Sequence, residues 1–272
     1  MAGDGRPAAA FFDLDKTLIE GSSAFQFARA AYRAKLLGRR QLLSDAIANV
    51  QFRIRGASDE DSLALRERIA SSLAGTRVTE LERLGADVLA GILPRVYPKM
   101  LALAHEHQDA GRRAFIVTAA SRDLADILAR VMAFDGAIGS QISEVVDGVY
   151  TGKPAGLFIY GAGKARAIEE LAEREGIDLS ASYAYSDSES DLPMLRAVGH
   201  PVAVNPDPRL ARIARQQQWQ VLRFDRLRRR VRMAAVVTVA ATAGGVGSVA
   251  LVGRARSGPI RSRLAHRRPG SS

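Results

Sequence analysis

Two carboxylates, Asp13 and Asp15, follow the first apolar run of the chain. The run covers 8–12 (AAAFF) and ends abruptly at the polar cluster DLDKT. A short apolar run of this kind predicts a buried strand. In an open parallel sheet the ligand crevice lies outside the carboxyl ends of the strands, where Asp13 and Asp15 would then lie. As a pair they could bind a hard divalent cation, and one of them could attack phosphorus.

Two more predicted strands end in residues of the same chemistry. The strand at 114–118 ends at the hydroxyl of Thr118, and the strand at 183–186 runs into the acidic stretch that contains Asp187 and Asp191. Lys164 lies between them in a Gly-Ala-Gly-Lys helix start. If the strands are parallel neighbours, these groups converge. Carboxylates, a hydroxyl and a lysine are what Mg²⁺-assisted phosphoryl transfer requires, and Mg²⁺ needs few carboxylates.

Strand–helix alternation after Pro94 predicts an α/β fold with a doubly wound parallel sheet. The expected helices lie at 96–109, 121–131 and 164–174, and the expected short final strands lie at 200–204 and 219–222. A hairpin turn at Asp147-Gly148 is expected within 138–150.

The residues between the first strand and Pro94 are expected to be helical throughout. They are rich in Ala, Leu, Arg and Glu, and breaks fall at Gly38, 56–59 and 75–76. We interpret them as a small helical-bundle cap inserted at about 22–94 into a core that covers 1–222. The alternative is that these helices simply pack on the sheet.

The composition limits the class of protein. The chain has 272 residues, of which 47% are hydrophobic, so one large α/β domain with an insertion, or two domains, can be built. It has no cysteine, which excludes disulfides, zinc–thiolate sites and thiol nucleophiles. The first residues, 1–7, do not resemble a secretory signal, so a cytoplasmic catalytic domain is expected.

The basic charge is concentrated in the tail, 223–272. This segment contains 12 of the 39 Lys and Arg residues and one of the 29 acids, so it accounts for the whole net charge of +10. It includes 233–252, twenty residues without a charge, which is a candidate transmembrane segment. Arginines flank it on both sides and leave its orientation open. Anchoring to the inner face of the plasma membrane is one expectation. A basic extension that touches nucleic acid or acidic partners is the other, although no specific nucleic acid is expected.

Four motifs together resemble the haloacid dehalogenase-like phosphohydrolases. DLDKT at 13–17 is similar to their first motif, FIVTAAS at 115–121 to the second, Lys164 to the third and SDSESD at 186–191 to the acidic fourth. The resemblance covers about 8–222 and is closest to the subgroup that contains phosphoserine phosphatase and its relatives. All four motifs occur in order at expected strand ends, which makes them more specific together than any one alone.

The resemblance implies a role for each motif residue. Asp13 would be the nucleophile, and Asp15 would protonate the leaving group and then activate water. Thr118 and Lys164 would hold the phosphoryl oxygens. Mg²⁺ would be bound by Asp187, the Asp13 carboxylate and the backbone carbonyl of Asp15. In addition, Asp191 would orient Lys164 or a metal-bound water.

The expected substrate-binding residues depart from the phosphoserine phosphatase pattern. Ser22 stands where those enzymes have a glutamate for the substrate amine, and Glu20 is two residues early. Arg68 is the candidate for an anionic substrate group, with Arg66 as a competitor. The remaining candidates and changes are Ala119 beside the second motif, Ser190 in place of an asparagine, Ser186 in place of a glycine, and Lys153 as a rival to Lys164.

The predicted function is therefore Mg²⁺-dependent hydrolysis of a small phosphomonoester through an aspartyl-phosphate. One alternative keeps the chemistry and takes a membrane lipid phosphate as the substrate, because of the apolar tail and the missing amine ligand. The other is a membrane-tethered regulatory protein that binds phosphate without turnover.

Overall fold

The computed structural model describes residues 6–35 and 59–224. The chain divides into two compact units, Met1–Arg223 and Phe224–Ser272, and the fold below belongs to the first. The candidate transmembrane segment at 233–252 and the predicted breaks at Gly38 and 56–58 lie outside the described residues. Among the helices of the described residues, none is both long enough and apolar enough to cross a membrane.

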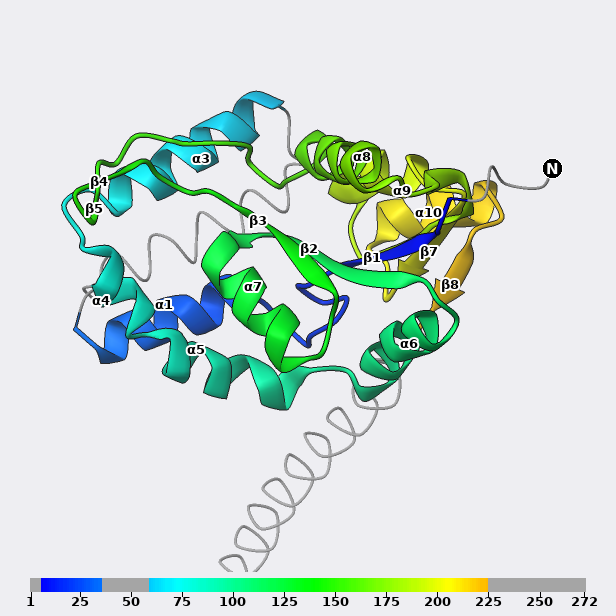
Figure 1. Cartoon of the computed structure of the whole chain (residues 1–272), viewed down its shortest axis with the longest axis horizontal. Helices are drawn as coiled ribbons and strands as arrows, with labels where there is room; N and C mark the ends of the chain where they lie inside the picture. The colour runs from blue at the N-terminus through cyan, green and yellow to red at the C-terminus, as the bar shows by residue number, and fades with distance from the viewer. Residues whose placement is uncertain (1–5, 36–58, 225–272) are drawn as a thin grey trace, which may run out of the picture. The chain divides into compact units, whose positions relative to one another are not determined.

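Six parallel strands form the central sheet in the order β3-β2-β1-β6-β7-β8 (Figure 1). β1 lies in the middle, and all five of its residues are buried, as expected for a parallel strand covered on both faces. This arrangement confirms the predicted α/β fold with a doubly wound sheet. The strand bounds are Ala9–Asp13 for β1, Arg113–Ser121 for β2, Gly136–Ser140 for β3, Tyr183–Ser186 for β6, His200–Val204 for β7 and Gln220–Leu222 for β8.

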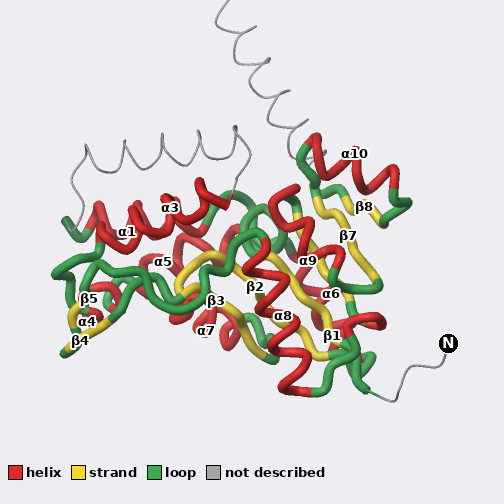
Figure 2. The backbone as a smooth tube through the Cα atoms, turned by 90° about the horizontal axis from the view of Figure 1, so that it is seen from above, coloured by secondary structure: helices red, strands yellow, loops and turns green. Residues whose placement is uncertain are grey.

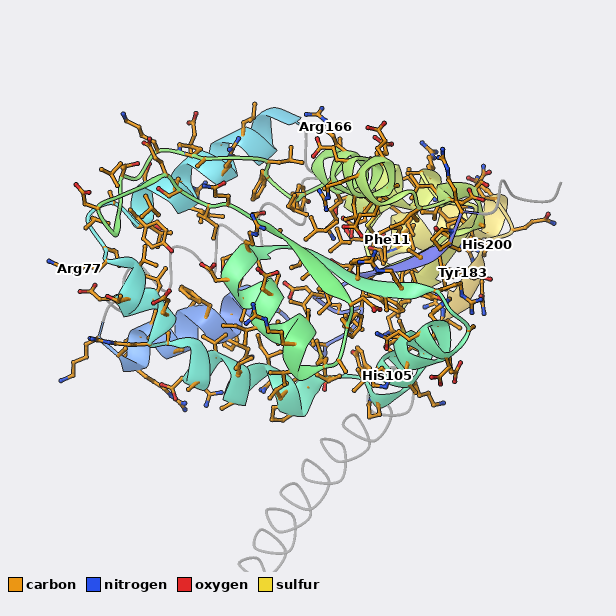
Figure 3. All side chains as sticks on the ribbon, viewed as in Figure 1. Phe11, Arg77, His105, Arg166, Tyr183 and His200 are labelled. Carbon is orange, nitrogen blue, oxygen red and sulfur yellow. The ribbon has the colours of Figure 1, made fainter. Side chains whose placement is uncertain are left out.

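Helices cover both faces of the sheet, with α6 and α8 on opposite sides of the strands in Figure 1. Successive side chains of β1 point to opposite faces. Phe11 joins a core with Ile168 of α8 and Met194 of α9, and Figure 3 shows its label beside α8. Phe12 points the other way, and its ring stacks on Tyr185 at 4.4 Å. The helix bounds are Pro98–Asp109 for α6, Arg122–Val131 for α7, Ala162–Glu175 for α8, Leu192–Arg196 for α9 and Pro208–Gln216 for α10.

The regular elements described between β1 and α6 are all helices, as predicted. They are α1 (Ser23–Arg33), α3 (Asp59–Ser72), α4 (Val78–Glu82), α5 (Gly85–Ile92) and the 3-10 turn η1 (Leu93–Arg95). Gly75, at φ 79°, separates α3 from α4 at the predicted break between helices. Figures 1 and 2 show α1, α3, α4 and α5 grouped at one end of the molecule, which is the end toward which the strands of the sheet run.

A short hairpin connects the sheet region to these inserted helices. Its strands are β4 (Val145–Val146) and β5 (Val149–Tyr150), and the turn lies at Asp147-Gly148, as predicted. Both turn residues have positive φ, 50° and 75°, which suits a two-residue hairpin turn. The backbone N–H of Gly75 donates to the carbonyl of Tyr150 at 2.9 Å, and Tyr150 N–H donates to the carbonyl of Thr76 at 3.0 Å.

Three elements differ from the sequence-based expectation, and the first is the short helix α9, which was not predicted. The start of the predicted hairpin region is a separate strand, β3, which pairs with β2 through Ile138 and Val117. Its sequence, GAIGS, contains two glycines and little intrinsic strand preference, so pairing with β2 determines its conformation. The helix α10 was not predicted, although Asp207 caps its N-terminus and Pro208 follows, which is a recognisable start signal.

Candidate active site

A buried lysine and two buried aspartates meet at the carboxyl end of β1. Lys164 Nζ donates to Asp13 Oδ1 at 2.5 Å and to Asp191 Oδ2 at 2.7 Å. Asp13, Lys164 and Asp191 are 6%, 3% and 2% exposed. Three charged side chains at this depth are stable only as a paired set, because an isolated buried charge is costly.

The register of the sheet brings the predicted motifs to the same level. Asp13 pairs with Val117 of β2, and Phe12 pairs with Tyr185 of β6. Thr118 and Asp187 therefore follow the last paired positions on the two strands that flank β1. Both are buried, and the Thr118 hydroxyl accepts a hydrogen bond from Ala120 N–H at 3.1 Å.

Two glycines bring Lys164 to this position. Gly161 has φ 54°, a conformation that favours glycine, and α8 begins directly after it. A Cβ on Gly163 would lie 2.0 Å from the carbonyl oxygen of Phe158, so no larger residue fits there. Burial lowers the pKa of Lys164, but the charges of Asp13 and Asp191 outweigh it, so the pKa is raised and the lysine stays protonated.

The acidic motif after β6 is held by its own serines. Ser186 Oγ donates to Asp191 Oδ2 at 2.7 Å, on the same oxygen that Lys164 contacts. Ser188 N–H donates to Ser186 Oγ at 3.2 Å, and the hydroxyls of Ser188 and Ser190 lie 2.9 Å apart. Ser186 therefore has a structural role, orienting Asp191, which the sequence analysis did not find.

Asp15 is held by the start of α1. Its Oδ1 accepts the backbone N–H of Ser23 at 2.7 Å, and its Oδ2 accepts the hydroxyl of Ser22 at 3.1 Å. The loop between them turns back through positive φ at Lys16 (60°) and Gly21 (95°), and Lys16 N–H donates to the Gly21 carbonyl at 3.1 Å. The contribution of Ser23 comes from its backbone, which no side-chain motif could have revealed.

The charge balance and the donor set fit a hard divalent cation. The pKa of Asp13 is raised to about 8, because burial and the Asp191 and Asp187 carboxylates together outweigh the opposing charge of Lys164. Lys16 Nζ lies 3.5 Å from Asp187 Oδ2. The described residues contain no cluster of three or more carboxylate or imidazole side chains that could hold a metal. Asp13, Asp187 and the Asp15 carbonyl would instead supply two carboxylates and one backbone oxygen, donors that Mg²⁺ accepts alongside water.

A cavity of about 2970 Å³ opens above these residues, between the strand ends and the inserted helices. It is lined by all four predicted substrate-binding residues, Ser22, Arg68, Ala119 and Ser190. Arg66 also lines it, and its guanidinium donates to the carbonyl of Gly156. The described residues that line the cavity include neither of the remaining candidates, Glu20 and Lys153.

Comparisons with known proteins agree with the motifs. Residues 10–196 match the family model of the haloacid dehalogenase-like hydrolases. The chain is 36% identical over 252 residues to phosphoserine phosphatase SerB1 of Mycobacterium tuberculosis, covering 92% of this chain and 82% of that protein. It is 38% identical over 261 residues to a probable phosphatase of the same organism, covering 94% and 90%.

Solved structures show the same fold. A protein of unknown function from Bordetella pertussis Tohama I has a TM-score of 0.69 at 28% identity, covering 80% of this chain and 98% of that one. A substrate-bound phosphoserine phosphatase has a TM-score of 0.61 at 18% identity, covering 85% and 99%. The chain belongs to the haloacid dehalogenase-like hydrolases, and it is a phosphatase.

Proposed function

We propose that the chain hydrolyses small phosphomonoesters by a Mg²⁺-dependent mechanism in which Asp13 becomes an aspartyl-phosphate. The observation that carries this proposal is the position of Asp13. It ends the central strand at the floor of the cavity, bonded to a buried, protonated lysine. A carboxylate fixed in this way can be aligned with phosphorus, and phosphoryl transfer depends mainly on positioning and charge stabilisation.

The reaction proceeds in two displacements. An oxygen of Asp13 attacks phosphorus, the bond from phosphorus to the ester oxygen breaks, and Asp15 gives its proton to the departing alkoxide. Water then attacks the aspartyl-phosphate, Asp15 takes a proton from that water, and inorganic phosphate leaves. Thr118 and Lys164 hold the phosphoryl oxygens, while Asp191 holds Lys164 in place. Asp13, Asp187 and the Asp15 carbonyl would hold Mg²⁺, which would neutralise negative charge on the phosphoryl group.

The inserted helices act as a cap over a core of residues 1–222. Residues of α1 and α3 line the cavity together with the strand ends, and the β4–β5 hairpin joins the two parts by backbone hydrogen bonds. A cap at about 22–94 would exclude water before chemistry and select the substrate. Within it, Arg68 is exposed and faces the cavity. Arg68→Ala should raise KM for an anionic substrate such as phosphoserine and barely change KM for p-nitrophenyl phosphate.

A second candidate substrate is a phosphomonoester with a long apolar leaving group, such as a membrane lipid phosphate. Seven large apolar side chains are exposed among the described residues, and four of them line the cavity: Phe25, Leu63, Ile127 and Val145. A cytoplasmic body anchored to the inner face of the plasma membrane through 233–252 would meet such a substrate. The full chain would then pellet with membranes and resist carbonate washing, whereas a chain ending at Phe224 would not.

Release of p-nitrophenol from p-nitrophenyl phosphate tests the enzymatic proposal. Hydrolysis should require Mg²⁺ and stop in EDTA, and beryllofluoride should inhibit by mimicking the aspartyl-phosphate. A screen over phosphoserine, sugar phosphates and lysophospholipid phosphates then separates the two substrate classes. Binding of phosphate without any turnover would leave the regulatory alternative.

A further inference from the structure

Ser22 occupies the N-cap position of α1 but does not cap it. Its backbone is extended, with φ −127° and ψ 130°, as an N-cap residue should be. A serine there normally accepts a hydrogen bond from a backbone N–H in the first turn of the helix. No such bond is formed, and the hydroxyl donates instead to Asp15 Oδ2. The side chain of Ser22 is therefore directed at Asp15 and not at its own helix.

The two oxygens of Asp15 have partners of different kinds. Oδ1 accepts the backbone N–H of Ser23 at 2.7 Å, and that group can only donate. Oδ1 is therefore held as an acceptor by a partner that cannot change its role, and Oδ2 is the oxygen left to exchange a proton with a bound substrate. Oδ2 lies beside a hydroxyl, which can donate or accept. The geometry therefore distinguishes the proton-carrying oxygen from the fixed one.

We propose that Ser22 is a positioning residue for the acid–base step, because it holds Asp15 Oδ2 where that oxygen transfers protons. The inference rests on the proposed function, which makes Asp15 the acid and base. Asp15, Ser22 and Ser23 all line the cavity, so the pair of Asp15 and Ser22 lies where an ester would bind. The Ser22 side chain is half-buried and bonded to Asp15 Oδ2, and it is part of the cavity wall.

The movement of the proton during the reaction explains why a hydroxyl is useful beside Asp15 Oδ2. When phosphorus is transferred to Asp13, Oδ2–H gives its proton to the ester oxygen and Asp15 becomes a carboxylate. The Ser22 hydroxyl then donates to Oδ2 and stabilises the new negative charge. When water attacks the aspartyl-phosphate, Oδ2 takes a proton from it and returns to the acid form. Ser22 itself neither gains nor loses a proton.

The test uses three phosphate esters of similar shape whose leaving groups depend to different degrees on protonation by Asp15. The p-nitrophenolate ion leaves without protonation. Phenolate depends more on proton donation, and the benzyl alkoxide depends on it most. For Ser22→Ala we expect kcat/KM to fall roughly tenfold or more on benzyl phosphate, less on phenyl phosphate and by under about threefold on p-nitrophenyl phosphate. The parameter kcat/KM is chosen because it reports the steps up to transfer of phosphorus to the enzyme.

Two control variants separate positioning from structure. Ser22→Thr keeps the hydroxyl and should restore the wild-type dependence on the leaving group. Ser180→Ala removes an exposed serine that bonds Asp178 and should change none of the three values. An equal loss on all three esters, or a rise in KM alone, would overturn the role of Ser22. If the wild-type chain hydrolyses none of them, the proposed function itself has failed.

Discussion

The two ends of the parallel strands both bury polar side chains, but they do so in opposite ways. At the carboxyl ends, Asp13 and Asp191 both bond to one buried cation, Lys164, and Asp187 is buried near them with Lys16 at 3.5 Å. Acid is in excess there, and the pKa of Asp13 rises to about 8 as burial and its acidic neighbours oppose ionisation. This excess of buried acid is the charge that the proposed divalent cation would neutralise.

On the α6 face of the sheet, from Tyr183 and His200 at the amino ends of β6 and β7 to Tyr185 further along β6, the polar groups satisfy one another. Arg112 Nε donates to His107 Nδ1 at 2.7 Å, so the imidazole is neutral with its proton on Nε2, which lies 2.7 Å from the hydroxyl of Tyr185. Tyr183 stacks on His200 at the start of β6 and β7, where Figure 3 labels both side by side. Burial and Arg112 lower the pKa of His107 to about 4. The buried polar groups around Lys164 are therefore expected to take part in the reaction, whereas those around His107 are expected to stabilise the fold.

The largest expected effect is that of Asp13→Asn. Loss of the nucleophile should reduce turnover of p-nitrophenyl phosphate by several orders of magnitude, because the uncatalysed hydrolysis of such esters is extremely slow. The fold should survive, and thermal melting in EDTA should occur no lower than in wild type, because burial raises the pKa of Asp13 and makes its ionised form unfavourable in the fold. Asp147→Asn in the exposed hairpin turn is the matched control and should keep full activity. A wild-type kcat in Asp13→Asn would contradict the mechanism.

Asp187→Ala should have the next largest effect. Removing one of two expected carboxylate ligands should raise the Mg²⁺ concentration for half-maximal activity about tenfold or more, or abolish activity. The rise in melting temperature on adding Mg²⁺ should shrink in parallel, which is a readout independent of turnover. Undiminished activity of the wild-type enzyme in EDTA would show that the metal part of the proposal is wrong.

The sequence predicted the carboxyl end of the sheet far better than the amino end. Asp13, Thr118 and Asp187 each follow a short apolar run, and the rule that parallel strands share a carboxyl edge was enough to bring them together. The fold class follows from the alternation of strands and helices after Pro94. Their individual roles remain proposals, because spacing shows that groups converge but does not show what they bind.

The features that the sequence did not predict depend mostly on tertiary contacts, which leave no pattern in the local sequence. His107 and Tyr185 are 78 residues apart, and nothing in either segment indicates that one ring will bond the other. The contact of Ser23 with Asp15 uses a backbone N–H, which every residue except proline has. The strand β3 was hidden because its glycines carry no strand signal, whereas α10 had a start signal at Asp207 and Pro208 that could have been recognised.

His107→Ala tests the stabilising end of the comparison. The change removes the hydrogen bonds of the Tyr185 hydroxyl and of Arg112 Nε to the imidazole and opens a cavity, so the free energy of unfolding should fall by about 2–4 kcal/mol. The kcat on p-nitrophenyl phosphate at 25 °C should remain within about threefold of wild type, because unfolding and not chemistry is affected. His105→Ala, on the same helix but only half-buried, is the control for urea denaturation and should cost less. A large loss of kcat in folded His107→Ala would link this cluster to catalysis.

Acid should destabilise the protein through the same imidazole. The pKa of His107 is about 4 in the folded chain and near 6.5 when unfolded, so the unfolded state takes up the proton first as pH falls. The contribution is fully present above pH 6.5 and is lost as pH falls toward 4, by about 2 kcal/mol between pH 7 and pH 5. The difference in unfolding free energy between wild type and His107→Leu should narrow by that amount over this range. A constant difference would show that folding does not lower the pKa of His107.

The smallest effect expected is that of His200→Ala, at the exposed edge of the amino-end cluster. The ring of His200 stacks on Tyr183 at 4.5 Å with 21° between the planes, but it faces solvent, so its loss should cost only about 0.5–1 kcal/mol. Tyr183 also carries the guanidinium of Arg112 over its ring at 5.4 Å, which should keep it in place. Urea denaturation of His200→Ala and His107→Ala in parallel measures how steeply stability rises from the rim of the cluster to its centre. Equal losses in the two variants would mean that the cluster acts as one cooperative unit, and a change in kcat/KM for either variant would mean that the two ends of the sheet are not separate.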